Sequence, residues 1–111
     1  MEIKTEEKSG ITISRVSGEI DINTSPEFKK AYEQHIKKDG IKLVINFKEV
    51  PYIDSSGLAT LVEILKTIKK VKGELVLVDL SEKLKGLFEI TKLSKLFKIA
   101  KTDDEAVSQI T

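Results

Sequence analysis

The stretch IKLVINFKEVPYIDSSGLATLVEIL, residues 41–65, joins two different periodicities. Residues 41–47 form an almost unbroken run of apolar, β-favouring side chains, which is typical of a central strand covered on both faces. From Leu58 onward, apolar residues recur at helical spacing and predict an amphipathic helix. Between the two segments stands a polar tetrad, Asp54-Ser55-Ser56-Gly57. The stretch therefore predicts a strand, a loop and a helix, with three polar side chains crowded at the start of that helix.

The rest of the chain repeats this alternation. Residues 2–7 and 11–16 predict two strands, with a turn at Ser9-Gly10 that makes them a hairpin. Further strands are expected at 74–80 and 97–100, and further helices around 28–36, 84–91 and 102–110. The resulting order, ββαβαβαβα, predicts an α/β fold: one domain over residues 1–111, with a mixed, mostly parallel sheet flanked by helices.

Local signals support the predicted helix starts. Thr24 with Glu27, and Thr102 with Glu105, have the spacing of capping boxes. His35 is the single histidine; it falls on the apolar stripe of the first helix, and we expect it to pack there. Since no cysteine or second histidine accompanies it, the sequence predicts no metal site.

Composition narrows the class of function. The chain has 19 basic and 18 acidic residues and a net charge of +1, which gives no overall field to attract nucleic acid or an anionic membrane. The absence of cysteine excludes disulfides and thiolate chemistry. No apolar run approaches the roughly 20 residues that span a bilayer, and MEIKTEE does not read as a signal peptide. We therefore expect a soluble, cytoplasmic domain, and with no GxxxxGK[ST] or GxGxxG motif we expect no cofactor.

The predicted topology groups the polar loops. If the strands after the hairpin are parallel, their carboxyl-terminal loops share one edge of the sheet, where open α/β sheets usually bind their ligands. That edge would gather residues 21–25, 54–57, 79–81 and 102–103. The sequence thus predicts that loops rich in acidic and hydroxyl side chains are neighbours in space.

The tetrad itself has two interpretations. Aspartate and serine are favoured helix caps, and Gly57 would let the helix approach the sheet closely. However, a cap needs only one side chain; if Ser55 caps, Ser56 takes the first helical position and its hydroxyl is free to face outward. Such a hydroxyl is a candidate phosphate acceptor, because a helix N-terminus favours an anion. A catalytic role for Ser56 is not expected, since no motif places a base beside it.

Three segments resemble the anti-sigma factor antagonists of the STAS-domain family, in order and along essentially the whole chain. They are GEIDINTSPEFKKAY (18–32), LVINFKEVPYIDSSGLATLVEI (43–64) and GELVLVDLSEKLKGLFEITKLSKLFKI (73–99). The tetrad at 54–57 is the most recognisable signature of that family, and the segment at 18–21 and the LxGLFxxTxL pattern from Leu84 to Leu93 support it.

The resemblance implies a partner switch. In this family the unphosphorylated antagonist binds an anti-sigma factor that is also a serine kinase, and so frees a sigma factor. The kinase phosphorylates the second serine of the signature, here Ser56, which abolishes the complex, and a serine phosphatase resets the system. The residues that the resemblance places at the partner-binding surface are Asp21, Thr24, Ser25, Asp54, Ser55, Ser56 and Gly57.

Two alternatives stay open at this point. The chain could be a STAS-fold scaffold or accessory protein, stressosome-like or attached to a lipid transporter, that is not switched by serine phosphorylation. It could also be a metal-dependent aspartyl-phosphate receiver, since Asp21, Asp54 and Asp79 follow predicted strands. The opening hairpin and the single aspartate after each strand argue against a receiver, which starts with a strand, a helix and an acidic pair.

Overall fold

The computed structural model describes residues 1–110 and has the predicted order of elements. The strands are β1 (Glu2–Lys8), β2 (Ile11–Ser17), β3 (Lys42–Glu49), β4 (Glu74–Val78) and β5 (Lys98–Ala100). The α-helices are α1 (Ser25–His35), α2 (Ser55–Lys70), α3 (Glu82–Ile90) and α4 (Asp103–Ile110), and a 3-10 turn, η1 (Leu93–Lys95), follows α3. The expected α/β class and the element order are confirmed; the 3-10 turn was not predicted.

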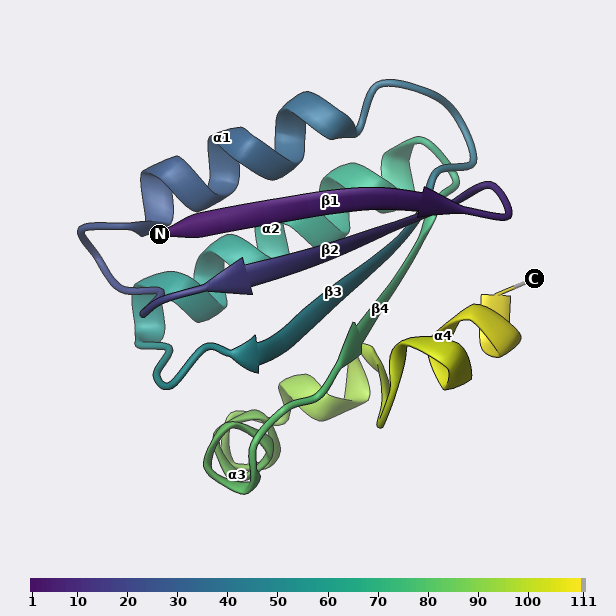
Figure 1. Cartoon of the computed structure of the whole chain (residues 1–111). Helices are drawn as coiled ribbons and strands as arrows, with labels where there is room; N and C mark the ends of the chain where they lie inside the picture. The colour runs from purple at the N-terminus through teal and green to yellow at the C-terminus, as the bar shows by residue number, and fades with distance from the viewer. Residues whose placement is uncertain (111) are drawn as a thin grey trace.

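The five strands form one sheet in the order β1-β2-β3-β4-β5. β1 pairs antiparallel with β2 through the hairpin, and each remaining pair is parallel. Because β2, β3 and β4 run the same way and each leads into a helix, their carboxyl ends lie at one edge of the sheet (Figure 1). This is the arrangement that the alternating sequence predicted.

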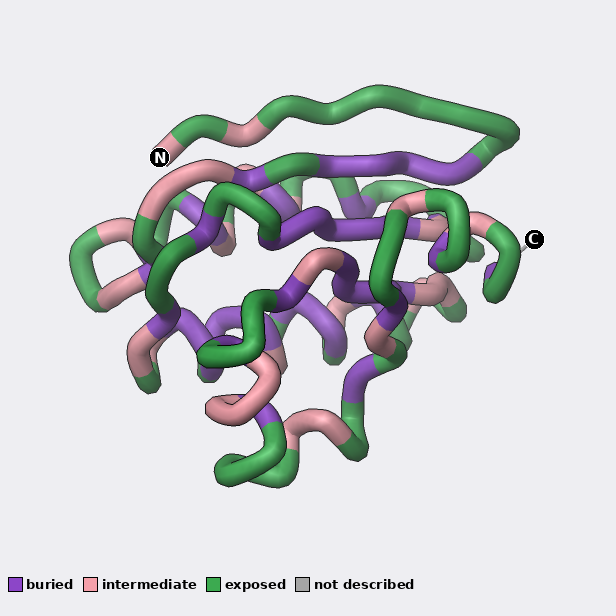
Figure 2. The backbone as a smooth tube through the Cα atoms, turned by 60° about the horizontal axis from the view of Figure 1, so that its bottom comes forward, coloured by how far each residue is buried: buried purple, intermediate pink, exposed green. Residues whose placement is uncertain are grey.

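Helices cover both faces of the sheet, unequally. The larger core lies between one face and α1, α2 and α3, and it includes Phe28, Tyr32, Leu61 and Phe88. The smaller core lies on the opposite face, against α4. Figure 2 shows the result: the central strands are mostly buried, whereas β1 is exposed along nearly its whole length.

Two local predictions about α1 are wrong. Thr24 occupies the N-cap position but makes no capping hydrogen bond, because its hydroxyl is used inside the preceding loop. His35 is exposed: α1 ends at this residue, and Ile36, one position further, turns into the core instead. The second capping box is supported, since the Glu105 backbone N–H donates to Thr102 Oγ1 at 3.1 Å.

Candidate functional site

The site begins where the pairing of β2 and β3 continues beyond the strands themselves. Ile20 and Ile53 form an isolated parallel bridge. The Ile20 N–H donates to the Tyr52 carbonyl at 3.0 Å, and the Asp54 N–H donates to the Ile20 carbonyl at 3.1 Å. Asp21 and Asp54 each follow a bridging residue directly, so the two loops leave the sheet side by side.

Gly57 allows α2 to start directly against this bridge. A Cβ at Gly57 would lie 2.7 Å from the Ile20 carbonyl oxygen and 2.7 Å from Ile53 Cγ2. The first of these atoms belongs to the backbone and cannot rotate away. The glycine of the tetrad is therefore required by the close approach of helix and sheet, as its position in the sequence suggested.

Asp54 connects the two loops through its carboxylate. Oδ1 accepts from the Gly57 N–H at 3.0 Å, which caps α2, and Oδ2 accepts from the Ile22 N–H at 3.1 Å. One carboxylate thus satisfies a free donor of the helix and holds the loop between β2 and α1. We call this arrangement, Asp54 with the backbones of Ile22 and Gly57, the Asp54 hub.

The loop before α1 is ordered by its own side chains. Asp21 Oδ1 accepts from the Asn23 and Thr24 N–H groups at 2.9 and 3.0 Å. Thr24 Oγ1 accepts from the Asp21 N–H at 2.9 Å and donates to the Glu19 carbonyl at 2.8 Å. These bonds fix the backbone of the loop and leave Ile22 at its surface, 70% exposed.

The two serines of the tetrad occupy the first turn of α2. Because Asp54 is the cap, Ser55 takes the first helical position and Ser56 the second, one position later than a Ser55 cap would place it. Ser55 is exposed and Ser56 is half-buried. Within residues 1–110 neither hydroxyl has a hydrogen-bond partner. Both hydroxyls are thus available at the positive end of the α2 dipole.

The predicted surface residues are not all at the surface. Asp21, Thr24 and Asp54 are half-buried and joined as described above. Ser25 is only 7% exposed, and its hydroxyl has no hydrogen-bond partner among the described residues. Gly57 is buried as well. Ser25 and Gly57 therefore offer a partner little direct contact.

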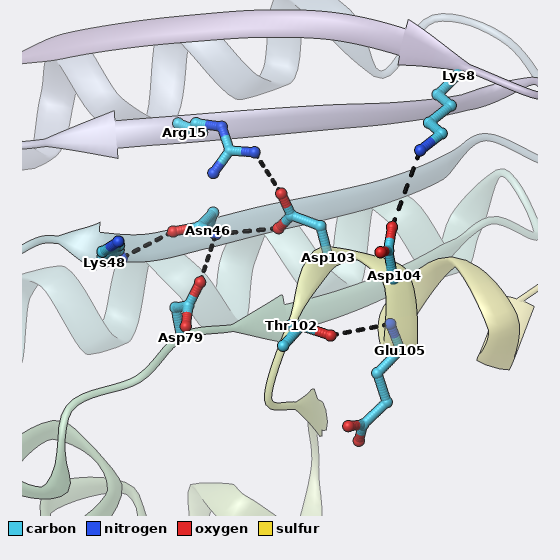
Figure 3. Close-up of polar contacts among 9 residues, drawn as sticks. All are labelled: Lys8, Arg15, Asn46, Lys48, Asp79, Thr102, Asp103, Asp104 and Glu105. Carbon is cyan, nitrogen blue, oxygen red and sulfur yellow. Dashed lines mark hydrogen bonds and ion pairs between the residues drawn. The ribbon is translucent and has the colours of Figure 1, made fainter.

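A second polar network lies at the same edge, against α4 (Figure 3). Asn46, 2% exposed, donates through Nδ2 to Asp79 at 2.8 Å and to Asp103 at 2.9 Å. Arg15 forms an ion pair with the other oxygen of Asp103. We call these four residues the Asn46 hub. The sequence analysis did not predict a role for Asn46. The signal was present, because a single amide inside an apolar strand needs buried hydrogen-bond partners.

The polar loops therefore form two groups instead of one. The loops at 21–25 and 54–57 meet at the Asp54 hub, while Asp79 and Asp103 meet at the Asn46 hub. In the part of the chain that the structure describes, no group of three or more histidine, cysteine or acidic side chains could hold a metal ion. The aspartates that a receiver domain would bring together are thus divided between two networks.

A cleft adjoins the Asp54 hub. Its volume is about 450 Å³, and it lies between the start of α2 and the length of α3. Asp54 and Ser55 stand on one side and Leu87 and Ile90 on the other. Among residues 1–110, no helix combines the length and the apolar character needed to cross a bilayer.

Comparison with known proteins agrees with this geometry. The model of the STAS domain family matches residues 2–106. The anti-sigma-B factor antagonist of Listeria monocytogenes is 43% identical over 105 residues, which covers 95% of this chain and 91% of the relative. That of Bacillus subtilis is 36% identical over 92 residues, covering 83% and 84%.

A solved structure extends the agreement to the fold. The crystal structure of an anti-sigma factor antagonist from Mycobacterium paratuberculosis superposes with a TM-score of 0.85 at 28% identity, covering 98% of this chain and 94% of that one. The chain belongs to the STAS domain family, and within it to the anti-sigma factor antagonists.

Proposed function

We propose that this protein is the phosphorylation-controlled antagonist of an anti-sigma factor that is also a serine kinase. In its unphosphorylated form it binds the kinase and so releases a sigma factor. Phosphorylation on Ser56 abolishes the complex, and a serine phosphatase restores the binding form. The chain itself catalyses no reaction in this scheme; it is the substrate and the ligand of its partners.

The position of Ser56 is the observation that carries the proposal. The residue lies in the first turn of α2, beside the Asp54 hub, and its hydroxyl has no partner within the described part of the chain. Asp54 already supplies the cap, so neither serine is needed to hold the helix. A hydroxyl that the fold does not use, at a helix N-terminus, is well placed to accept a phosphate.

The effect of the phosphate follows from its charge. It adds about −1.5 to −2 charges at neutral pH. The dipole of α2 tolerates an anion at this end, so the fold is retained. A partner docked on the same edge would have to desolvate the dianion or face it with its own charges, and each 1.4 kcal/mol of this cost weakens the complex about tenfold. No change of fold is needed.

The site of modification is tested directly. The protein is incubated with ATP and the anti-sigma factor kinase encoded in the same genome, and the phosphate is mapped by mass spectrometry. We expect it on Ser56, with Ser56→Ala unmodified and Ser55→Ala modified like wild type. Because Ser55 is the more exposed of the two, a phosphate on Ser55, or on Thr24, would refute the assignment.

Affinity for the kinase tests the switch. With a non-hydrolysable ATP analogue, which prevents turnover, wild type and Ser56→Ala should bind alike, and Ser56→Asp should bind at least about tenfold more weakly. Equal affinity of wild type, Ser56→Ala and Ser56→Asp would instead favour a STAS-fold scaffold or accessory protein that serine phosphorylation does not switch.

A further inference from the structure

A second hollow lies at the end of the sheet opposite the Asp54 hub. Figure 1 shows the turn between β1 and β2 beside the loop that leads from α1 to β3, at the end of the molecule away from the start of α2. Between these segments is a cavity of about 460 Å³, lined by residues of β1, β2, the end of α1 and the loop after it. We call it the hairpin cavity. Its size lies within the range of small-molecule sites.

The charges that line the hairpin cavity are mainly positive. Lys37, Lys38 and Lys42 line it, and none of them has an ion pair within residues 1–110. Two features oppose them, the Glu7 carboxylate and the carboxyl end of α1, which together amount to about one and a half negative charges. Asp39, between the lysines in the chain, does not line the cavity. The lining therefore has a net positive charge.

The dipole of α1 does not account for the whole cluster. A helix C-terminus favours a nearby cation, which explains lysines directly after α1 such as Lys37 and Lys38. Lys42 is the first residue of β3, and the effect of the dipole falls off within the last turn of a helix. Three ammonium groups around one cavity repel one another. An anion bound among them would replace that repulsion by attraction.

Thr12 supplies an observation that is independent of charge. It lines the cavity and is only 9% exposed, and its hydroxyl has no hydrogen-bond partner among the described residues. The other hydroxyl groups on this face of the hairpin are engaged: Thr5 donates to Ser14 at 3.4 Å, and the Ser14 oxygen lies 2.6 Å from that of Tyr32. Since buried polar groups are rarely left unpaired, the Thr12 hydroxyl is an available donor for a ligand in the cavity.

We propose that the hairpin cavity binds a small anion that carries two phosphate groups. The ammonium groups of the three lysines pair with the phosphate oxygens, and the Thr12 hydroxyl and an imidazole N–H of His35, which also lines the cavity, each donate a hydrogen bond. Among the described residues no aromatic ring of Phe, Tyr or Trp lines it, so recognition is directed at the phosphates and not at an attached ring. The site does not depend on Ser56, because it lies at the other end of the sheet.

An NMR titration of the isotope-labelled protein, followed by backbone amide shifts, tests the site. Inorganic pyrophosphate and fructose bisphosphate are the probes, which separate an inorganic ligand from a phosphate ester, and inorganic phosphate is the reference. We expect the largest shifts at Thr12 and Lys42, and an affinity for at least one probe that is about tenfold higher than for inorganic phosphate. Binding of only one probe would identify the source of the phosphates. Shifts confined to the start of α2, or no binding of either probe, would overturn the inference and leave the proposed function standing.

Substitutions of two lining residues sharpen the test. Thr12→Val removes a hydroxyl that the fold does not use, so stability in urea should equal or exceed that of wild type, while affinity for the tighter-bound probe falls about tenfold. Lys42→Gln should weaken binding by a similar factor. Lys101→Gln, at an exposed lysine outside the cavity, is the control and should bind within about twofold of wild type. If all three variants bind alike, the cavity does not hold the anion and the inference is wrong.

Discussion

Asp54 and Asn46 both organise the carboxyl edge of the sheet, but they do so in opposite ways. The carboxylate of Asp54 accepts only from backbone N–H groups, at Gly57 and Ile22, and leaves the neighbouring side chains free. The amide of Asn46 donates to two side chains and is itself buried. The first hub shapes a surface without using up its functional groups, whereas the second uses its polar groups to join elements of the fold.

The difference between the two hubs predicts which substitutions change partner binding and which change only the stability of the fold. Substitutions at the Asp54 hub should change affinity for a partner as well as the free energy of unfolding. Substitutions at interior polar groups should change the free energy of unfolding alone. The predictions below test that separation, from the largest expected effect to the smallest.

Gly57→Ala should have the largest effect. The new Cβ would meet the Ile20 carbonyl oxygen and Ile53 Cγ2 at 2.7 Å, which forces α2 away from the sheet. We expect a loss of about 3 kcal/mol in the free energy of unfolding, measured by urea denaturation, and weaker binding to the kinase. Gly86→Ala is the matched control, because nothing lies within 4 Å of its Cβ position. Equal stability of the two variants would contradict the close approach.

Tyr32 is another buried polar side chain, and it lies on the face of the sheet opposite the Asn46 hub. Burial raises the pKa of Tyr32 from 10.0 to about 12, opposed by the hydrogen bond with Ser14, whose oxygen lies 2.6 Å from the phenol oxygen. The folded state therefore favours the neutral phenol. The resulting stabilisation is fully present below pH 10 and is lost as the pH rises toward 12, by about 2 to 3 kcal/mol.

The control for this pH dependence is Tyr32→Phe, which has no phenol to ionise. Deprotonation of the lysines affects both proteins alike, so the difference between their unfolding free energies isolates Tyr32. We expect that difference to change between pH 9 and about pH 12. Parallel curves for the two proteins over this range would show that Tyr32 does not titrate as described.

Asn46→Ala should destabilise the protein by about 2 kcal/mol, because Asp79 and Asp103 lose a buried donor. Kinase affinity, measured at a temperature where the variant is folded, should stay within about twofold of wild type. Asn23→Ala, at an exposed loop position, is the control for losing an amide without burial. A tenfold loss of affinity in Asn46→Ala would break the distinction between the two hubs.

Asp54→Ala and Thr102→Ala should have the smallest effects on stability. Each removes a side chain that caps a helix. Each should cost about 1 kcal/mol of stability. Only Asp54 also holds the Ile22 loop, whereas Thr102 serves α4 on the other face. We therefore expect Asp54→Ala to weaken kinase binding several-fold and Thr102→Ala to leave it unchanged. Equal affinities would mean that the loop is held without Asp54.

Much of the fold could be predicted from local pattern. The apolar run at 41–47 and the helical spacing after Leu58 predicted a parallel strand and the helix that follows it. The common direction of the parallel strands then predicted that the loops at 21–25 and 54–57 lie together. These predictions succeed because they depend on periodicity and on the common direction of parallel strands. Gly57 was anticipated for the same reason: it stands where a helix begins against a sheet.

Predictions that depended on competition between nearby groups were less successful. Thr24 has the spacing of a capping residue. Its hydroxyl, however, is hydrogen-bonded to the Asp21 N–H and the Glu19 carbonyl and does not cap the helix. His35 matches the apolar stripe, yet the helix ends there and the residue is exposed. The partners of Asn46 lie 33 and 57 residues further along the chain. Residue spacing and helix or strand propensity could not predict these contacts, because they form only in the folded tertiary structure.

The exposed strand β1 has a consequence for how the molecule behaves at high concentration. It forms the outer edge of the sheet, and its seven residues, EIKTEEK, include five that are charged. A strand from another copy that added to this edge would have to align with carboxylates and ammonium groups on a surface that water already solvates well. Charged edge strands discourage such polymerisation. Strand addition by a second copy is therefore disfavoured along the whole length of this edge.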